Sequence, residues 1–342
     1  MIRVLITEDS SSAAEVMRVI LESAGDIEVV GRAKNGKESI RLTEQLKPDI
    51  ILMDITMPVM DGLEATRVIM NKMPTPILIL SSLIKDDCGI GFEALKAGAL
   101  DIMEKPALQL NHSDLSYEEE LIRKIRIVSK VRPIHLINRL EKKYLDTPRV
   151  KVVKDNRILA IGASTGGPPA ICSILKNFVP GFPLPILVVQ HICNGFTQGM
   201  VNWLGKNCSL KVKLAGDGEK VAGGVAYFAP DDFHLAIDSS YRIILSKEQP
   251  IGGHRPSVDF MLKHVARAYK EKSIVILLTG MGKDGTEGLR AIKGWGGKCI
   301  VQDEKSSVVF GMPKAAIDAG LADVISPLEK IPSEILKLLS VQ

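Results

Sequence analysis

The chain has 342 residues and a formal net charge of +4, and at this length we expect two domains, each with its own core. Its 46% hydrophobic and 25% charged residues are typical of a globular protein. No apolar run approaches the ~20 residues that span a bilayer, so membrane insertion is not expected. The chain starts directly with a strand-like segment rather than a signal-peptide pattern. Five scattered cysteines without a Cys-X-X-Cys pair predict reduced thiols in a cytoplasmic protein, with no disulfide framework or zinc site.

Residues 1–105 alternate strand-like and helix-like patterns five times. The apolar runs predicted as strands are Ile2–Ile6, Ile27–Val30, Ile50–Met53, Ile77–Leu80 and Ala99–Met103. This alternation predicts an α/β domain, with a parallel sheet covered by helices on both faces. Ligands of such sheets bind outside the carboxyl ends of the strands.

Four of these five strands end in residues with complementary chemistry. The residues are Glu8-Asp9, Asp54, Ser81-Ser82 and Lys105-Pro106. Carboxylates that converge repel one another unless a cation binds them, and oxygen ligands suit Mg²⁺. A hydroxyl and an amine suit phosphoryl oxygens, and an aspartate can act as a nucleophile that forms an acyl phosphate. A solvated loop is the simpler explanation for any one of these residues, but not for the set.

Together with Met57-Pro58 and Asp61-Gly62 after Asp54, these strand ends resemble a response-regulator receiver domain. The resemblance covers residues 1 to about 128 and implies a flavodoxin-like fold, with a five-stranded parallel sheet in the order 2-1-3-4-5. It also implies that a histidine kinase phosphorylates Asp54.

The same resemblance implies roles for the surrounding residues. Mg²⁺ would be held by Asp9, Asp54 and the backbone carbonyl of Thr56, with Glu8 in support. Ser81 and Lys105 would sense the phosphoryl group. At the position where the family often has an aromatic switch residue, this chain has Ile102.

Residues 131–155 lack clean periodicity, and the stretch from Arg123 to Lys154 is dense in Lys and Arg. We therefore predict a receiver domain over 1–130, a basic linker over 131–155 and a second domain over 156–342. A basic arm for nucleic acid is the alternative to a solvated linker. No later segment resembles a helix-turn-helix, so a nucleic-acid partner is not expected.

The second domain begins with a strand-like run, Ile158–Ile161, that breaks into glycines before a helical pattern opened by two prolines. Gly162–Gly166 fits the Gly-X-Ser-X-Gly nucleophile elbow, which exposes the oxygen of Ser164. Amides at the helix start can then receive an oxyanion. Glycines that permit close packing or cradle a phosphate are the alternatives. No Gly-Lys-Ser/Thr follows, so a nucleotide P-loop is not expected.

Two further segments can complete a catalytic site around Ser164. His191 directly follows the apolar run Leu184–Gln190, so it stands at a strand's carboxyl end like Ser164. The strand-like run Ile274–Leu278 leads into a glycine-rich loop containing Asp284, which could orient His191 or merely cap the next helix. Glycines flank Met281 in that loop and free its backbone amide to face an oxyanion.

These motifs, with Tyr227–Pro230 and Arg255–Asp259, resemble the catalytic domain of the chemotaxis protein-glutamate methylesterases. The match covers almost the whole chain and implies a doubly wound, mostly parallel α/β hydrolytic domain with a β-hairpin. We also expect a strand pair formed by residues 226–228 and 233–237. Ile192-Cys193-Asn194 replaces the residues that the family usually has after the catalytic histidine.

The resemblance implies that Ser164 is the nucleophile, His191 the general base and Asp284 its partner, with Met281 (backbone) and Thr165 in the oxyanion hole. The expected reaction removes methyl esters from receptor glutamates, and the family also deamidates glutamines. Phosphorylation would activate it, Mg²⁺ would serve only the receiver, and the esterase would need no cofactor. Expected partners are the histidine kinase and the cytoplasmic domains of chemoreceptors.

Two other functions remain open from sequence alone. One is a phosphorylation-dependent regulator that binds DNA or protein without catalysis. The other is a phosphate-binding module that uses the glycines at 162–167 and 280–285.

Overall fold

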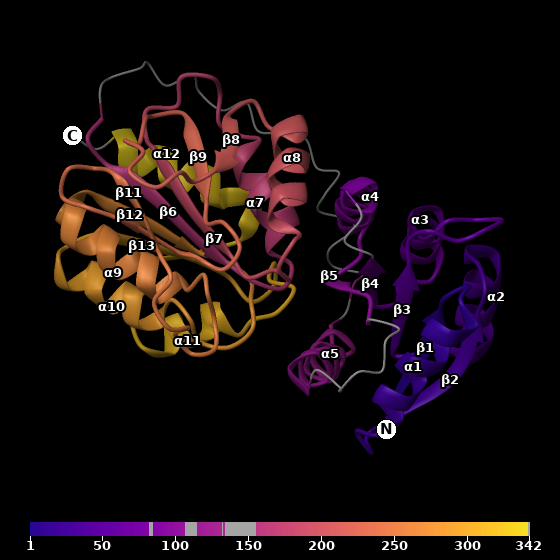
Figure 1. Cartoon of the computed structure of the whole chain (residues 1–342). Helices are drawn as coiled ribbons and strands as arrows, with labels where there is room; N and C mark the ends of the chain where they lie inside the picture. The colour runs from indigo at the N-terminus through magenta and orange to yellow at the C-terminus, as the bar shows by residue number, and fades with distance from the viewer. Residues whose placement is uncertain (82–84, 107–114, 132, 134–154, 341–342) are drawn as a thin grey trace. The chain divides into compact units, whose positions relative to one another are not determined.

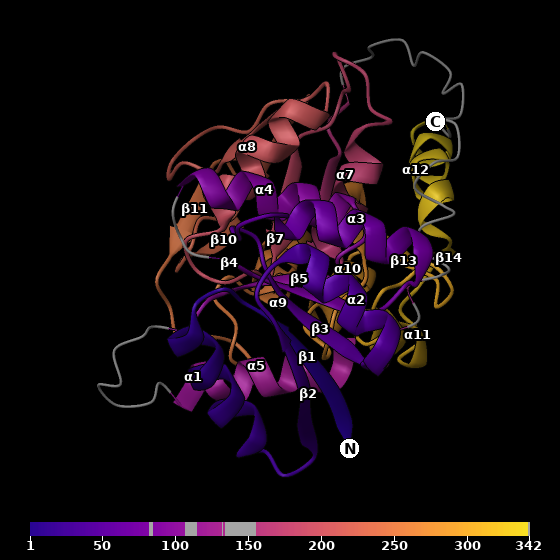
Figure 2. The same ribbon diagram turned by 90° about the vertical axis from the view of Figure 1, so that its right-hand side faces the viewer.

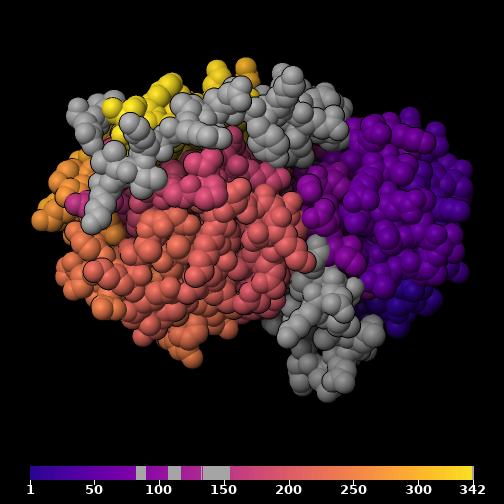
Figure 3. Space-filling model, turned by 90° about the horizontal axis from the view of Figure 1, so that it is seen from above, coloured from indigo at the N-terminus to yellow at the C-terminus, as the bar shows by residue number. Residues whose placement is uncertain are grey.

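The computed structural model describes residues 1–81, 85–106, 115–131, 133 and 155–340. The chain divides into two compact units, Met1–Lys142 and Lys143–Gln342, each formed by one continuous run of residues (Figure 3). The predicted linker over 131–155 lies almost entirely outside the described residues, so its boundaries remain a prediction. None of the described helices has both the length and the apolar character needed to cross a bilayer.

The amino-terminal unit is a five-stranded parallel sheet in the order β2-β1-β3-β4-β5, which confirms the predicted receiver topology. Helices α1 and α5 lie on one face, and α2, α3 and α4 lie on the other (Figures 1 and 2). The elements are β1 (Ile2–Thr7), α1 (Ser11–Glu22), β2 (Ile27–Ala33), α2 (Gly36–Leu46), β3 (Ile50–Asp54), α3 (Gly62–Lys72), β4 (Ile77–Ser81), α4 (Lys85–Lys96), β5 (Asp101–Glu104) and α5 (Leu115–Val128). β3 and β4 are buried along their whole length, as strands covered on both faces must be.

The carboxy-terminal unit is a seven-stranded sheet in the order β14-β13-β12-β6-β7-β9-β8, and all its strand pairs are parallel. Its elements up to β11 are β6 (Ile158–Ala163), α7 (Gly167–Leu175), β7 (Ile186–Gln190), α8 (Thr197–Asn207), β8 (Lys211–Leu214), β9 (Val225–Phe228), β10 (His234–Ile237) and β11 (Ile243–Ser246). The others are α9 (Val258–Tyr269), β12 (Ser273–Leu277), α10 (Thr286–Gly294), β13 (Lys298–Gln302), α11 (Met312–Asp318), β14 (Val324–Ser326) and α12 (Ile331–Ser340), with 3₁₀ turns at Lys270–Lys272 and Leu328–Lys330.

Helices cover both faces of this sheet, as the doubly wound prediction requires. α9, α10 and α11 lie on one face, and α7, α8 and α12 lie on the other (Figure 1). The first face holds a continuous apolar core that includes Val258, Leu262, Leu289 and Met312. From β6 the chain first builds the β7 side and then returns to place β12 on the other side of β6. The gap between β6 and β12 is therefore a topological switch point, where ligands of open sheets bind.

The prediction that 226–228 pairs with 233–237 was wrong, because each of these strands has other partners. β9 lies in the large sheet, parallel to β7 and β8, while β10 pairs antiparallel with β11. The hairpin turn is made by Asp238, whose carboxylate accepts from the amides of Ser240 (2.8 Å) and Arg242 (2.9 Å). Because this turn contains no glycine and depends on a side chain, the usual two-residue turn signal is missing.

A buried ion pair in the receiver unit provides a test of its packing. Lys124 Nζ on α5 lies 2.7 Å from Asp101 Oδ2 on β5, and each side chain is only 10% exposed. We expect Lys124→Met to destabilise this unit by about 3–5 kcal/mol, because Asp101 keeps a buried charge without its partner. Differential scanning calorimetry of the full chain should show a lower receiver transition. Arg41→Met, which removes an exposed pair with Glu38, is the control and should leave the transition unchanged.

Candidate functional site

Ser164 lies in the turn between β6 and α7, where the elbow motif predicted it. Its amide donates to the carbonyl of Thr279 (3.0 Å), which ties the turn to the end of β12. Its carbonyl accepts from the amide of Gly167 (2.7 Å). Gly166 adopts φ +77°, a left-handed conformation that glycine reaches without strain. Ser164 is buried, with only 9% of the residue exposed.

His191 follows β7 directly, on the strand next to that of Ser164. Its amide donates to the carbonyl of Ala163 (3.0 Å), the residue before the serine. Its Nε2 lies 2.9 Å from Oδ2 of Asp284. Since a carboxylate only accepts, Nε2 carries the proton and Nδ1 carries the lone pair. Nδ1 is buried and has no hydrogen-bond partner among the described residues. His191 can therefore act as a base through Nδ1.

Asp284 is held at the amino terminus of α9, which the sequence did not reveal. Oδ1 accepts from the hydroxyl of Ser257 (3.0 Å) and the amides of Asp259 (2.9 Å) and Gly285 (3.0 Å). Oδ2 accepts from the amide of Val258 (2.8 Å) as well as from His191. The alternative in which Asp284 caps a helix is thus realised too, but on α9 rather than on the next helix.

These donors keep the Asp284 carboxylate ionised. Burial alone would raise its pKa, but the hydrogen bond and charge of His191, together with the α9 amides, outweigh burial and lower the pKa to about 2. A charged carboxylate on Nε2 fixes the imidazole tautomer and stabilises the imidazolium that forms when Nδ1 takes a proton.

The structure adds His254 to this group, which sequence reasoning had assigned only to a loop. Its ring stacks on that of His191, with centroids 4.0 Å apart and planes inclined by 8°. The stack holds the plane of the His191 ring. The only available sequence signal was its position beside the motif Arg255–Asp259.

The loop after His191, where the sequence departs from the family, is fastened to the loop after β9. Asn194 Nδ2 donates to Asp232 (3.1 Å), and the Gly195 amide donates to Asp231 (3.0 Å). The hydroxyl of Thr197 also donates to Asp231. Asp231 thus fastens the chain on both sides of Phe196, the residue before α8, whose own side chain forms no capping hydrogen bond.

Both predicted oxyanion-hole residues lie near Ser164. Thr165 follows it in the turn and is 7% exposed. Met281 follows Gly280, and a Cβ built on Gly280 would approach Ser164 Cβ to 2.7 Å. Gly282 has φ +83°, so the turn that places Met281 requires a glycine. Among the described residues, the Met281 amide forms no hydrogen bond.

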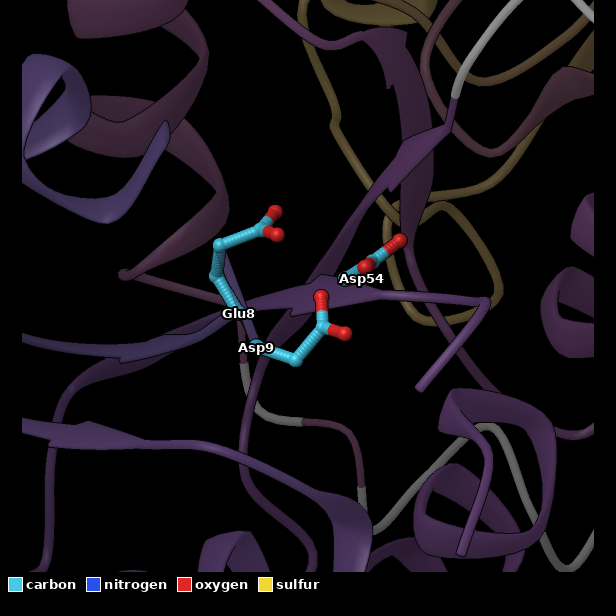
Figure 4. A group of neighbouring side chains, drawn as sticks. All are labelled: Glu8, Asp9 and Asp54. Carbon is cyan, nitrogen blue, oxygen red and sulfur yellow. The ribbon is translucent and has the colours of Figure 1, made fainter. Parts of the chain in front are cut away.

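In the receiver unit, Glu8, Asp9 and Asp54 meet at the carboxyl ends of β1 and β3 (Figure 4). One oxygen from each carboxylate lies within 4.8 Å of the others. Glu8 and Asp54 are buried and Asp9 is exposed. Thr56 sits on the loop after β3, and its amide donates to Asp54 Oδ1 (3.2 Å).

Lys105 joins this cluster from the end of β5. Its Nζ lies 2.7 Å from Asp54 Oδ2 and 2.9 Å from Glu8 Oε2. Burial raises the pKa of both carboxyls, an effect that Lys105 only partly offsets. Burial lowers the pKa of Lys105, but these two carboxylates raise it overall. Ser81 is buried at the end of β4, and its carbonyl accepts from the Lys105 amide (3.0 Å).

The residues present fit a divalent cation. Three carboxylates converge on one point, and the single charge of Lys105 cannot balance all three. Burial is the main cause of the raised pKa values of Glu8 and Asp54, and the charge of Asp54 adds to the effect at Glu8. A hard cation with oxygen ligands, such as Mg²⁺, would relieve the repulsion.

Ile102, at the position of the family's aromatic switch, is buried in the core of the unit. It is 1% exposed, and its Cδ1 lies 2.4 Å from where a Cβ on Gly91 of α4 would be. Ile102 is thus an aliphatic core residue, and this position carries no aromatic ring that could act as a rotamer switch.

Comparison with known proteins follows the division into two units. The family described as response regulator receiver domain matches residues 4–113, and the family described as CheB methylesterase matches residues 159–335. A curated protein-glutamate methylesterase/protein-glutamine glutaminase from Thermotoga maritima is 41% identical over 340 residues, covering 98% of each chain. One from Myxococcus xanthus is 39% identical over 341 residues, covering 98% of this chain and 96% of its own.

A solved structure is similar as well. The crystal structure of the Thermotoga maritima CheB methylesterase catalytic domain is 44% identical and superposes with a TM-score of 0.53, covering 54% of this chain and all of its own. The two folds and the matched families define a response regulator whose output domain is a hydrolase. More particularly, the chain belongs to the family of chemotaxis protein-glutamate methylesterases/protein-glutamine glutaminases. The comparisons do not support a regulator that only binds DNA or protein.

The environment of Asp284 predicts a pH-dependent stability. Its pKa is lower in the folded chain than the ordinary 3.8, so its contribution is fully present above about pH 4 and is lost as the pH falls toward 2. A shift of this size corresponds to about 2 kcal/mol. The difference in free energy of unfolding between wild type and Asp284→Asn should therefore shrink over this range in urea titrations. A difference that stays constant with pH would contradict an ionised, donor-rich Asp284.

Proposed function

We propose that the carboxy-terminal unit hydrolyses γ-methyl esters of glutamate side chains in chemoreceptor cytoplasmic domains, with Ser164 as the nucleophile. The observation that carries the proposal is the His191–Asp284 pair. It leaves Nδ1 of His191 buried and without a hydrogen-bond partner among the described residues, at the end of the strand next to that of Ser164. A phosphate-binding module would not need this pair.

In the first step, Ser164 Oγ attacks the ester carbonyl carbon while His191 Nδ1 takes the hydroxyl proton. The carbonyl oxygen becomes an oxyanion that the amides of Met281 and Thr165 stabilise. The imidazolium, paired through Nε2 with Asp284, then protonates the leaving methoxide and methanol departs. The product is an ester between the Ser164 hydroxyl and the γ-carboxyl group of the glutamyl side chain.

In the second step, water replaces methanol as the partner of His191. Nδ1 takes a proton from the water as it attacks the acyl-enzyme, and Ser164 leaves with that proton. The released product is a glutamate side chain. A glutamine side chain can enter the same sequence and release ammonia, which accounts for a glutaminase activity by the same residues. Neither step calls on a cofactor.

We further propose that a histidine kinase phosphorylates Asp54 and that this activates the hydrolase. Asp9, Asp54 and the Thr56 carbonyl would hold Mg²⁺, which screens the charge between the carboxylate and the incoming phosphoryl group, and Glu8 supports the site. Lys105 and Ser81 would bind phosphoryl oxygens. A coupling free energy of order 1–3 kcal/mol between the units is sufficient for activation. With these partners, the proposed location of the protein is the cytoplasm.

Ser164→Ala should abolish methanol release from methylated receptor, with a fall in kcat of order 10⁴–10⁶-fold, because the triad acts as a unit. A gas-chromatographic assay of methanol measures this. The same variant should gain no mass from a sulfonyl fluoride that labels the wild type. Ser173→Ala, on the helix that follows, is the matched control and should behave as wild type. Near-native turnover in Ser164→Ala would refute the assignment.

Asp54→Asn should accept no phosphoryl group from acetyl phosphate and Mg²⁺, whereas the wild type gains one base-labile group. The donor should raise wild-type methanol release roughly 5- to 150-fold and leave the variant unchanged. Asp49→Asn removes an exposed carboxylate of the same unit and is the control, so it should be phosphorylated like the wild type. Equal labelling of Asp54→Asn and wild type would move the acceptor to another residue.

A further inference from the structure

Gln190 is a buried polar residue beside the catalytic group that the proposed mechanism does not use. It ends β7, pairs in register with Ala163 of β6, and is 6% exposed. It therefore lies beside Ala163, the residue before Ser164, and directly precedes His191 in the chain.

The Gln190 side chain connects the main chains of these two residues. Nε2 donates to the carbonyl of Ser164 (2.8 Å) and to the carbonyl of His191 (2.7 Å). Two carbonyl acceptors require the NH₂ end of the amide, so the network fixes the orientation of the side chain. The Ser164 carbonyl also accepts from Gly167 N (2.7 Å), so both its lone pairs are used.

The other end of the amide shows that this arrangement is specific. Oε1 is buried and has no hydrogen-bond partner among the described residues. It lies 1.9 Å from where a Cβ on Gly167 would be, so only glycine leaves room for it. A buried carbonyl without a partner is costly. Its presence indicates that placing both N–H groups on the main chain matters more than satisfying this oxygen.

We propose that Gln190 is a positioning residue that sets the direction of the Thr165 amide in the oxyanion hole. The Ser164 carbonyl and the Thr165 N–H belong to one planar trans peptide and point in opposite directions. Two hydrogen bonds on the carbonyl therefore fix the N–H as well. The bond to His191 keeps this peptide in register with the base. The inference rests on the proposed role of Thr165 in the esterase reaction.

The expected signature is a loss in kcat without a matching change in KM. The oxyanion exists only after attack, so a misdirected amide weakens transition-state binding and leaves substrate binding unchanged. Losing one oxyanion donor costs about 10²–10³-fold in kcat, and misalignment should cost somewhat less. We expect Gln190→Met, which keeps the length and buried character of the side chain, to lower kcat roughly 10- to 100-fold.

The test compares full-length wild type, Gln190→Met and the control Gln198→Met on methylated receptor. Gln198 lies on α8 and its amide reaches only Asn202 (2.9 Å) in the contacts described. A second readout is inhibition by a trifluoromethyl ketone analogue of the glutamyl ester, which forms a tetrahedral oxyanion on Ser164. Gln190→Met should weaken this inhibitor by the same factor as kcat, with KM unchanged. A change in KM without a fall in kcat would overturn the proposal. So would an unchanged kcat in a folded variant.

Gly167→Ala provides an independent variant in which Gln190 itself is kept. The new methyl group displaces Oε1, so the same split between kcat and KM should appear. In the double variant with Gln190→Met, the loss should be smaller than the product of the two single losses, because both act through one contact. Multiplicative losses would contradict the proposal. Failure of the wild type to release methanol would instead refute the proposed function.

Discussion

The Asp284 carboxylate is the point on which the hydrolase site depends. It accepts hydrogen bonds from the first turn of α9 and from the imidazole of His191, so one charged group joins the loop after β12, the start of α9 and the end of β7. The strand order places β12, β6 and β7 side by side, with Ser164 at the end of the middle strand. Three loops that are far apart in the chain thus meet at the switch point of one parallel sheet.

Each unit has a functional aspartate at the carboxyl edge of its own sheet, but the surroundings shift the two pKa values in opposite directions. Asp284 is surrounded by donors, which lower its pKa and make it a permanent anion that needs no further ligand. Asp54 is also buried, but it shares Lys105 with Glu8, and its pKa is raised. Such an incompletely neutralised carboxylate favours a cation and a phosphoryl group. The number of donors around each carboxylate decides which chemistry it supports.

The site is ordered by main-chain contacts as much as by the catalytic side chains. Gln190 ties the Ser164 peptide to that of His191, and His254 stacks on the imidazole of His191, the proposed base. The loop with the unusual sequence Ile192-Cys193-Asn194 is fixed in turn through Asp231 and Asp232.

Sequence alone predicted the five strands of the receiver sheet and the polar residues that end them, because buried parallel strands read as apolar runs and functional residues follow each run directly. The doubly wound form of the second sheet was expected from the family resemblance. Sequence could not determine the partner of β10, since a strand's pairing depends on contacts across the fold and the Asp238 turn carries no glycine signal. Only the tertiary structure showed that Asp284 bonds to the amino terminus of α9, that Nδ1 of His191 has no hydrogen-bond partner among the described residues, and that Gln190 packs against Gly167. Each of these contacts joins segments that are distant in the chain or depends on the direction of a side chain, and no local pattern of residue types specifies either.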